Sequence, residues 1–535
     1  MNLHSYPYPS QRRVTVAPNG VVCTSQQLAA QAGLEMLKKG GNAVDAAIAT
    51  AACLTVVEPC SNGIGGDAFA LVWAGGKLHA LNSTGFCPAL LTADMVRAEG
   101  HKVMPTHGFF PQTVPGIPAA WAELSAKFGS LPMTELLAPA ISYAENGFAI
   151  GATVAEKWQE AANKTYAYVK DKPEFAEWYR VFTKDGEAPK AGDIYRLPDH
   201  AKTLREIAET KSESFYRGAI ADKIDAYMKS AGGYLRKEDL AKFYPEWVEP
   251  IKASYKGYDV WELPPNGQGM IALMALNILD GVELPALEDP KSWHLQIEAL
   301  KLAAIDAYKY IADPKFGMEF TPEQLLDPAY AARRRALIGD KAMLPEAGNP
   351  TDGGTVYLCT ADKDGNMVSF IQSNYNGFGS GVVIPGTGIA IHNRGKGFYL
   401  DADSKNCLAP GKRPYHTIIP GFITKDGEAV GPFGVMGAFM QPQGHLQTAL
   451  KLIEYHHNPQ AALDAPRWYW TGGKTVQLEH GVPLYIARAL EQMGHEIQYS
   501  IDRSPFGRGQ MIIRTEQGTL AAGTDPRCDG AAAAY

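Results

Sequence analysis

The spacing of hydrophobic and polar positions changes several times along the chain, and each pattern predicts a different kind of element. Residues 26–53 place apolar side chains at helical spacing, with a break at Gly40-Gly41. Residues 64–81 change to a strand-like pattern around Gly75-Gly76, which predicts a β-hairpin. Further helices are expected within residues 117–243, 292–312, 328–337 and 443–456, and strands at 497–501 and 510–515.

The residue composition and the hydrophobic pattern of the sequence change near residue 340. The stretch LPEAGNPTDGG, residues 344–354, is rich in turn-forming residues and has no apolar periodicity, so we expect an exposed connector there. From Thr355 onward, short β-rich runs alternate with glycine-containing turns. We therefore expect mainly short strands and turns after this connector.

Two of these β-rich runs flank DKDGN in the stretch GGTVYLCTADKDGNMVSFIQS, residues 353–373. A three-residue loop, Lys363-Asp364-Gly365, would place glycine where a positive φ is needed and would close a hairpin. In that register Thr355 faces Ser373, and their Cβ atoms would be about 5 Å apart. A β-bulge would shift the pairing by one residue.

A hydroxyl pair of this kind has two interpretations. Thr and Ser are common in strands, so the pair can be a purely structural feature. The preceding Gly353-Gly354 favours chemistry, because glycine leaves the Gly354 carbonyl sterically open. The Thr355 hydroxyl can attack that carbonyl, and hydrolysis of the resulting ester would free an α-amine on Thr355. With an intrinsic pKa of about 7.7–8, that amine is a suitable general base for the same hydroxyl.

Composition and charge restrict the classes of function. The 535 residues are 46% hydrophobic and 20% charged, with Lys+Arg 50 against Asp+Glu 57 and a formal net charge of −7. This mild charge, without a block of like charges, argues against nucleic acid and against a membrane surface, and favours a small-molecule partner. The N-terminal MNLHSYPYPSQRRVTV lacks the apolar stretch of a secretory signal, so a cytoplasmic location is expected.

Cysteine and histidine spacing indicates neither a metal site nor a cofactor site. The 7 cysteines include no CxxC pair, and the 13 histidines include no HExxH motif. Cys359 would share a strand face with Thr355, where a small buried residue is favoured over a reactive thiol. Glycines within residues 63–66 lack the Lys-Ser/Thr of a phosphate loop and are expected to form a turn near the active site.

Several long motifs, spread from end to end, resemble the γ-glutamyltransferase (glutathione hydrolase) family. They are MLKKGGNAVDAAIA, NGIGGDAF, VPGIPAAW from Val114, LPPNGQG from Leu263, TVYLCTADKDGN, GFGSG, GKRP from Gly411, DAPRW from Asp464 and the terminal GTDPRCDG. The resemblance implies an α+β fold, the four-layer αββα sandwich of N-terminal-nucleophile hydrolases. It also implies a proenzyme that cleaves itself between Gly354 and Thr355, giving a large subunit, residues 1–354, and a small subunit, residues 355–535.

Carried over to this sequence, the family's catalytic roles fall on four residues. Thr355 takes the position of the nucleophile, and Ser373 takes that of the hydroxyl residue that bonds to it. The family's oxyanion hole consists of two consecutive backbone N–H groups in a GSPGGS-like loop. That loop is GVMGAFMQPQG here and places Gly437 and Ala438 in the role, although the same glycines alone would also fit a simple turn. Each such donor lowers the barrier by about 3 kcal/mol.

The positions that hold the glutamyl group in the family differ in this chain. Thr84 replaces an arginine that binds the α-carboxylate, and Gly397 replaces an acidic residue that binds the α-amine. The remaining replacements are Tyr375 for an asparagine, Arg394 for a glutamine, and His416 and Thr417 for a pair of serines. A charge-assisted contact is worth about 1.5–3 kcal/mol, so the loss of two argues against efficient γ-glutamyl transfer.

These replacements predict a pocket lined by the cation Arg394, with His416 beside it and no acid to meet an amine. We therefore expect a small amide that bears a carboxylate and no amine. The segments NRG, KRPYHTIIPG and MQPQGH resemble the YwrD-like and oxamate amidohydrolase branch of the family. Three alternatives stay open: a cephalosporin-acylase-like amidase, a true γ-glutamyl hydrolase or transferase, and a non-catalytic or unprocessed binding relative. The expected partners are the amide and the chain's own two fragments, which could pair further into a homodimer of heterodimers.

Overall fold

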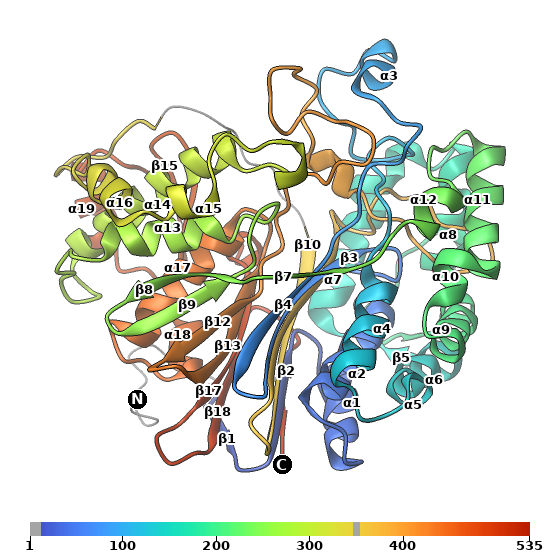
Figure 1. The fold of residues 1–535 in the computed structure, drawn as a ribbon, viewed down its shortest axis with the longest axis horizontal. Helices are drawn as coiled ribbons and strands as arrows, with labels where there is room; N and C mark the ends of the chain where they lie inside the picture. Colours follow the sequence, from blue (N-terminus) through green and yellow to red (C-terminus); the bar gives the residue numbers. More distant parts are fainter. Residues whose placement is uncertain (1–11, 346–353) are drawn as a thin grey trace.

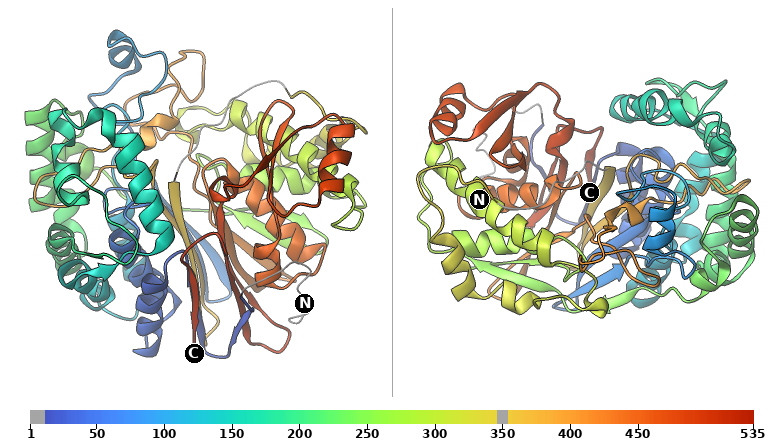
Figure 2. Two further views of the ribbon diagram at one scale, coloured as in Figure 1. Left: turned by 180° about the vertical axis from the view of Figure 1, so that it is seen from behind. Right: turned by 90° about the horizontal axis from the view of Figure 1, so that it is seen from above.

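The structure is a computed structural model that describes residues 12–345 and 354–535. Two seven-stranded sheets lie face to face in the middle of the molecule, and helices cover the outer side of each sheet (Figure 1). Views from behind and from above show the same arrangement of helices around the central strands (Figure 2). The expected α+β fold with a four-layer αββα sandwich is confirmed.

Neighbouring strands in both large sheets are antiparallel. Sheet I has the order β19 (Ala531–Ala534), β2 (Gly20–Thr24), β10 (Gly354–Asp362), β11 (Met367–Tyr375), β3 (Asp67–Ala74), β4 (Lys77–Ser83), β7 (Glu246–Val248). Sheet II has the order β1 (Thr15–Ala17), β18 (Leu520–Thr524), β17 (Arg508–Arg514), β13 (Glu428–Met436), β12 (Gly421–Lys425), β9 (Tyr258–Glu262), β8 (Ile251–Tyr255). Two small sheets contain β14 (Trp468–Gly472), β15 (Thr475–Glu479) and β16 (Glu496–Ser500), and β5 (Phe148–Ala149) and β6 (Ile194–Tyr195). Each large sheet therefore combines strands from both sides of residue 355.

The helical layer over sheet I begins with α1 (Gln27–Lys38) and α2 (Ala43–Val57). Every residue of α2 is buried, and the Asn42 side chain caps its N-terminus. The layer continues with α4 (Ile117–Phe128), α5 (Met133–Leu136), α6 (Ala138–Asn146), α7 (Ala152–Glu160), α8 (Ala176–Phe182), α9 (Pro198–Thr210), α10 (Glu213–Arg217), α11 (Ala219–Ala231) and α12 (Lys237–Ala241). Helix α3 (Ala93–Ala98) stands apart at the top of Figure 1.

The helical layer over sheet II is built from segments on both sides of residue 355. Its members are α13 (Met270–Leu279), α14 (Pro290–Tyr310), α15 (Pro322–Leu325), α16 (Pro328–Arg335), α17 (Met440–Ile453), α18 (Pro459–Asp464) and α19 (Leu484–Gln492). The helices expected within residues 117–243, 292–312, 328–337 and 443–456 are confirmed, as are the strands near 497–501 and 510–515. The expected connector falls mostly outside the described residues.

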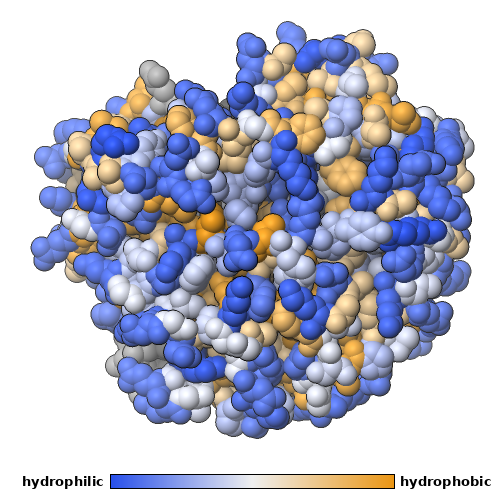
Figure 3. Space-filling model, viewed as in Figure 1, coloured by the Kyte–Doolittle hydropathy of each residue, from blue (hydrophilic) through white to orange (hydrophobic). Residues whose placement is uncertain are grey.

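Strand alternation separates the buried side chains into distinct layers. On β10, Val356 and Leu358 belong to the core between sheet I and its helices, whereas Tyr357 and Cys359 belong to the core between the two sheets. Polar residues cover most of the face seen in Figure 3, with hydrophobic residues in small groups among them. Among residues 12–345 and 354–535, no helix combines the length and apolar character that a membrane span requires.

The hairpin formed by β10 and β11 has the register that the sequence predicts. Val356 pairs with Gln372, and the ladder continues to Ala361 and Met367. Gly365 has a φ of +87°, in the position where the loop requires a left-handed residue. A bulge lies between Gly354 and Val356, so Thr355 itself sits at an irregularity in the ladder.

Candidate active site

Thr355 and Ser373 meet at the open end of the hairpin. The Thr355 Oγ1 lies 3.1 Å from the Ser373 Oγ, and both side chains are buried. The Tyr375 backbone N–H donates to the Ser373 Oγ at 2.8 Å. Because the Ser373 oxygen already accepts this bond, its own hydrogen can donate to the Thr355 oxygen and orient it. The bulge at Thr355 therefore leaves the predicted hydroxyl pair intact.

The turn after β13 carries Gly437 and Ala438, the expected oxyanion residues. Gly437 has a φ of +139° and Ala438 a φ of +50°, and helix α17 begins directly afterwards at Met440. Neither amide donates a hydrogen bond to another residue within the described ranges. Two unpaired amides beside a helix N-terminus create a local environment that favours an anion.

Packing between the sheets brings β13, the strand before this turn, against Tyr357, which lies two residues beyond Thr355 on β10. Gly434 on β13 has no side chain because the Tyr357 ring occupies that space: a Cβ atom there would lie 2.6 Å from a ring carbon. Gln268 links the turn to Thr417, since its side-chain amide donates to the Ala438 carbonyl at 2.8 Å and to the Thr417 carbonyl at 2.7 Å. The candidate oxyanion turn and Thr417 are therefore fixed by one side chain.

A fully buried carboxylate, Asp67, lies directly across the sheet I ladder from Ser373. Arg394 donates to it twice, from Nε at 2.7 Å and from Nη2 at 3.1 Å. The Arg394 Nη1 donates to the Thr417 Oγ1 at 2.8 Å. The guanidinium carbon lies 4.5 Å from the centre of the Tyr375 ring, as in a cation–π contact. Tyr375, Arg394 and Thr417 thus converge beside the hydroxyl pair.

Two histidines complete this cluster. The Ile418 N–H donates to His416 Nδ1 at 3.2 Å, so the ring proton is on Nε2, which donates to Asp67 Oδ2 at 2.7 Å. Burial and the neighbouring Arg394 lower the pKa of His416 to about 4, so the ring is neutral at pH 7. His392 Nδ1 lies 3.3 Å from the same oxygen.

The charge of the cluster is balanced. Burial alone would raise the pKa of Asp67, but Arg394 and then His416 more than offset it and hold that pKa well below its usual value. Asp67 is therefore ionised and neutralises Arg394. The expectation that Arg394 and His416 would line a pocket without an acid is wrong: the acid comes from β3, because that strand pairs with β11.

Comparison with known proteins shows the relationship that the motifs indicate. The profile of the family described as Gamma-glutamyltranspeptidase matches residues 29–535. The chain belongs to this family. It is 35% identical to the glutathione hydrolase-like YwrD proenzyme of Bacillus subtilis, over 96% of this chain and 98% of the relative. It is 34% identical to the oxamate amidohydrolase proenzyme of Klebsiella pneumoniae, over 97% of this chain and 99% of the relative.

The solved structures include a cephalosporin acylase from Bacillus halodurans. That chain is 56% identical, with a TM-score of 0.96, and the match covers 100% of this chain and 99% of the other. The family match, the shared fold and the hydrolase relatives together identify this chain as an N-terminal-nucleophile hydrolase.

Thr84 and Gly397, the two positions where the resemblance implies a lost charge, differ in their surroundings. The Thr84 hydroxyl donates to Asn82 at 2.7 Å, and in the described parts of the chain Thr84 forms no hydrogen bond with Asp67, Arg394 or His416. At Gly397, a Cβ atom would lie 2.6 Å from the Tyr415 carbonyl oxygen. The backbone therefore has no room for an acidic side chain at Gly397 without a shift.

Three residues of this region were not predicted from the sequence: Asp67, Gln268 and His392. Asp67 stands in the motif NGIGGDAF and begins a predicted strand, but the sequence does not state which strand pairs with β11. Gln268 lies in LPPNGQG, a motif that resembled the family without a role attached. An acidic residue at the start of an apolar strand, inside a family motif, is unusual. This feature of the sequence could have indicated a functional role for Asp67.

The remaining candidates for reactive or metal-binding groups have structural explanations. Cys359 pairs across the ladder with Cys23, and burial raises the pKa of its thiol well above the usual value. His294, Glu298 and His495 place ligand atoms within 4.8 Å of one another. The Lys301 ammonium already contacts Glu298 at 2.7 Å, and the two histidines bond to each other at 2.9 Å. This group is therefore stable as a hydrogen-bonded cluster without an ion.

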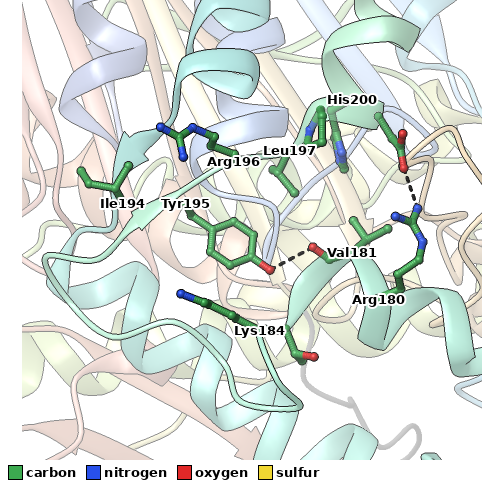
Figure 4. A pocket seen from close by; sticks show the side chains of 11 residues that line it. Arg180, Val181, Lys184, Ile194, Tyr195, Arg196, Leu197 and His200 are labelled. Atoms are coloured by element: carbon green, nitrogen blue, oxygen red, sulfur yellow. Dashed lines mark hydrogen bonds and ion pairs between the residues drawn. The ribbon is translucent and has the colours of Figure 1, made fainter.

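A cavity of about 350 Å³ lies in the helical layer between the end of α8 and the start of α9 (Figure 4). Two of its lining residues are joined by a hydrogen bond, in which the Tyr195 hydroxyl donates to the Val181 carbonyl at 2.9 Å. Arg180 is already paired with Glu177 and Asp199. None of the cavity's lining residues belongs to the hydroxyl pair or to the Asp67 cluster.

Proposed function

We propose that this chain is a self-processing amide hydrolase in which Thr355 is the nucleophile. The observation that carries the proposal is the 3.1 Å contact between the Thr355 and Ser373 hydroxyls at the start of β10. A nucleophile needs an oriented lone pair and a nearby base, and the amine freed by cleavage would supply the base. Ser373 is proposed to orient the oxygen, and Gly437 and Ala438 to bind the oxyanion.

In the proposed cleavage, the Thr355 Oγ1 attacks the Gly354 carbonyl carbon. The peptide C–N bond breaks as a C–O ester bond forms, and the departing nitrogen takes up the hydroxyl proton. Water then hydrolyses the ester, which leaves a carboxylate on Gly354 and restores the Thr355 hydroxyl. The products are the large subunit, residues 1–354, and the small subunit, residues 355–535.

The processed enzyme would use the same groups on a substrate amide. The α-amine of Thr355 accepts the hydroxyl proton as the oxygen attacks the amide carbonyl, and the two turn amides stabilise the oxyanion. The intermediate expels the substrate amine, which leaves with that proton, and an acyl ester remains on Thr355. Attack by water on the ester releases the acid and regenerates the enzyme.

We propose a small amide that carries a carboxylate and no amine, with oxamate as the favoured example. Arg394 has five N–H groups, and three of them donate to Asp67 and Thr417. The terminal nitrogens Nη1 and Nη2 keep one N–H each, which suits a carboxylate in fork geometry. Asp67 is neutralised by the same guanidinium, so an α-amine would gain little from it. The resemblance to the oxamate amidohydrolase supports this choice.

A second candidate is an acylase that removes an acyl group from a larger amine. It is favoured by the 56% identity to the cephalosporin acylase chain over the full length. Both candidates use the same nucleophile and differ in the size of the leaving amine.

Cleavage is tested by denaturing electrophoresis and N-terminal sequencing of the purified protein. The wild type should give two fragments, the smaller beginning Thr355-Val356-Tyr357, and Thr355→Ala should remain one inactive chain. A wild-type chain that stays intact would end the enzyme proposal. Cleavage of the same bond in Thr355→Ala would contradict the intramolecular mechanism.

Substrate class is tested with pairs that differ in one group. Oxamate and oxamide differ in a carboxylate, and ammonia release from each isolates the effect of that charge. Oxamate should be favoured by about tenfold or more, since one charge-assisted contact is worth about 1.5–3 kcal/mol. Arg394→Met should remove the preference. Robust γ-glutamyl-p-nitroanilide turnover that is independent of Arg394 would refute the substrate proposal.

A further inference from the structure

Two distant motifs, DAPRW and GTDPRCDG, have no role in the chemistry described so far. Their arginines and acids form one buried network. Arg467 Nη2 donates to Asp525 Oδ2 at 2.7 Å, and Arg527 donates to Asp525 Oδ1 at 3.0 Å and to Glu479. Arg467, Asp525 and Glu479 are each at most 1% exposed. Burial of so many charges carries a large desolvation cost, so we ask which part of the fold these residues hold in place.

The network holds a turn that precedes β17. Arg467 Nη1 donates to the Phe506 carbonyl at 2.8 Å and to the Gly507 carbonyl at 3.1 Å. On the other side of the turn, the Gly509 N–H donates to Asp525 Oδ2 at 2.8 Å. Burial alone would raise the pKa of Asp525, but Arg467 and Arg527 more than offset it and lower that pKa to about 2. The carboxylate is therefore ionised and anchors the turn from both ends.

The same turn packs directly against the candidate oxyanion residues. A Cβ atom on Gly437 would lie 3.1 Å from the Gly507 Cα, and a Cβ atom on Gly507 would lie 2.5 Å from the Met436 carbonyl oxygen. Phe506 packs with Met440, the first residue of α17. The segment from Met436 to Met440, which contains Gly437 and Ala438, is thus supported at both of its ends.

From this geometry we propose that Phe506 and Gly507, held by Arg467, position the backbone amides of Gly437 and Ala438 for the oxyanion. Arg467 touches neither Thr355 nor the reacting carbonyl in this scheme, so it is a positioning residue. Gln268 fixes the opposite side of the turn through the Ala438 carbonyl. Placement of the amides matters because donors stabilise the oxyanion only within a narrow distance range. The proposal rests on the proposed function, in which these amides bind the oxyanion.

The experiment compares Arg467→Lys with Arg503→Lys. Arg503 donates to Glu479 in the same network at 2.8 Å, but its side chain is 46% exposed. Within the described residues, the Arg503 side chain forms no hydrogen bond with the Phe506 or Gly507 carbonyl. Lysine keeps the charge at either position but cannot replace the two-sided contact of Arg467. Active sites are counted as N-terminal Thr355. With oxamate as the substrate, kcat is expressed per active site, and KM is taken from the same assay.

The expected result for Arg467→Lys is a kcat about 10–100-fold lower with KM within about twofold, since oxyanion donors act in the transition state. Arg503→Lys should leave both values within about twofold. A merely structural role would lower the melting temperature without changing kcat per site. An Arg467→Lys kcat within twofold of that of Arg503→Lys would overturn the proposal.

A second variant decides the question if Arg467→Lys fails to fold. Gly507→Ala leaves Arg467 intact but places a methyl group 2.5 Å from the Met436 carbonyl oxygen, at a residue whose φ is +74°. It should show the same loss of kcat at unchanged KM, and an unchanged kcat per site would also overturn the proposal. A wild-type enzyme without N-terminal Thr355 would instead refute the proposed function, so the two failures are distinguishable.

Discussion

The carboxylate of Asp67 binds the guanidinium of Arg394 through two hydrogen bonds, and both side chains are fully buried. Such a pair stabilises little as a whole, yet removal of one partner leaves an uncompensated buried charge. Asp67→Asn or Arg394→Met alone should destabilise the fold by about 3–5 kcal/mol. The double variant should lose clearly less than the sum of the two.

The measurement is urea unfolding of the single variants and the double variant, all in a Thr355→Ala background so that one uncleaved chain unfolds. Asparagine at position 67 can still accept the His416 hydrogen bond, so the cycle isolates the charge pair. Strictly additive losses would show that the two residues are not coupled.

Ser373 should affect rate more than binding. Ser373→Ala removes the oxygen that contacts Thr355 and that accepts the hydrogen bond from the Tyr375 N–H. We expect kcat to fall about 10–100-fold, because an oriented nucleophile accounts for a large part of the rate. Ser373→Thr retains the hydroxyl and should stay within about tenfold of the wild type. Self-cleavage, followed by electrophoresis over time, should slow in the same order, and a Ser373→Ala enzyme as fast as the wild type would remove Ser373 from the mechanism.

Glu262 should make the protein less stable as the pH rises. Burial raises the pKa of Glu262 well above its usual value, and its Oε1 lies 2.6 Å from His445 Nδ1. Above pH 4.5, the usual pKa of a glutamate side chain, the unfolded chain ionises this carboxyl while the folded chain keeps it protonated. Unfolding then releases a proton, so stability falls by up to about 1.4 kcal/mol per pH unit until the folded pKa is reached.

Glu262→Gln cannot ionise and should remove this dependence. The melting temperature of the variant relative to the wild type should rise with pH above about 4.5 and show a constant offset below it. Glu319→Gln, at an exposed position, controls for replacement of a carboxylate by an amide. A difference between Glu262→Gln and wild type that is flat from pH 4 to 8 would contradict the assignment.

Local patterns in the sequence predicted the elements and the hairpin because their causes lie close together in the chain. The Thr355–Ser373 contact follows from a loop with glycine at the left-handed position and from strand alternation, both within residues 353–373. Asp67 could not be placed in the same way. Its contact with Arg394 depends on which strand pairs with β11 and on where the chain returns after that strand, and neither is encoded in local periodicity.

The same limit applies to the oxyanion turn. Family resemblance proposes Gly437 and Ala438 for the oxyanion, but their contact with Gly507 depends on backbone atoms that meet through packing across sheet II. Positions that require glycine for close approach leave no distinctive pattern, because glycine also marks ordinary turns. The sequence therefore predicted the Thr355–Ser373 contact better than the packing around the candidate oxyanion turn.

The sheets interleave the two products of the proposed cleavage. In sheet I, β10 and β11 lie between β2 and β3, and in sheet II four strands of the small subunit lie between β1 and β9. The cleaved subunits could separate only by breaking both sheets, and once apart they would have to find each other by diffusion. Cleavage would thus turn a unimolecular folding reaction into a bimolecular one. The mature enzyme would then persist because its unfolding barrier is high, and the unfolding rate would set its lifetime.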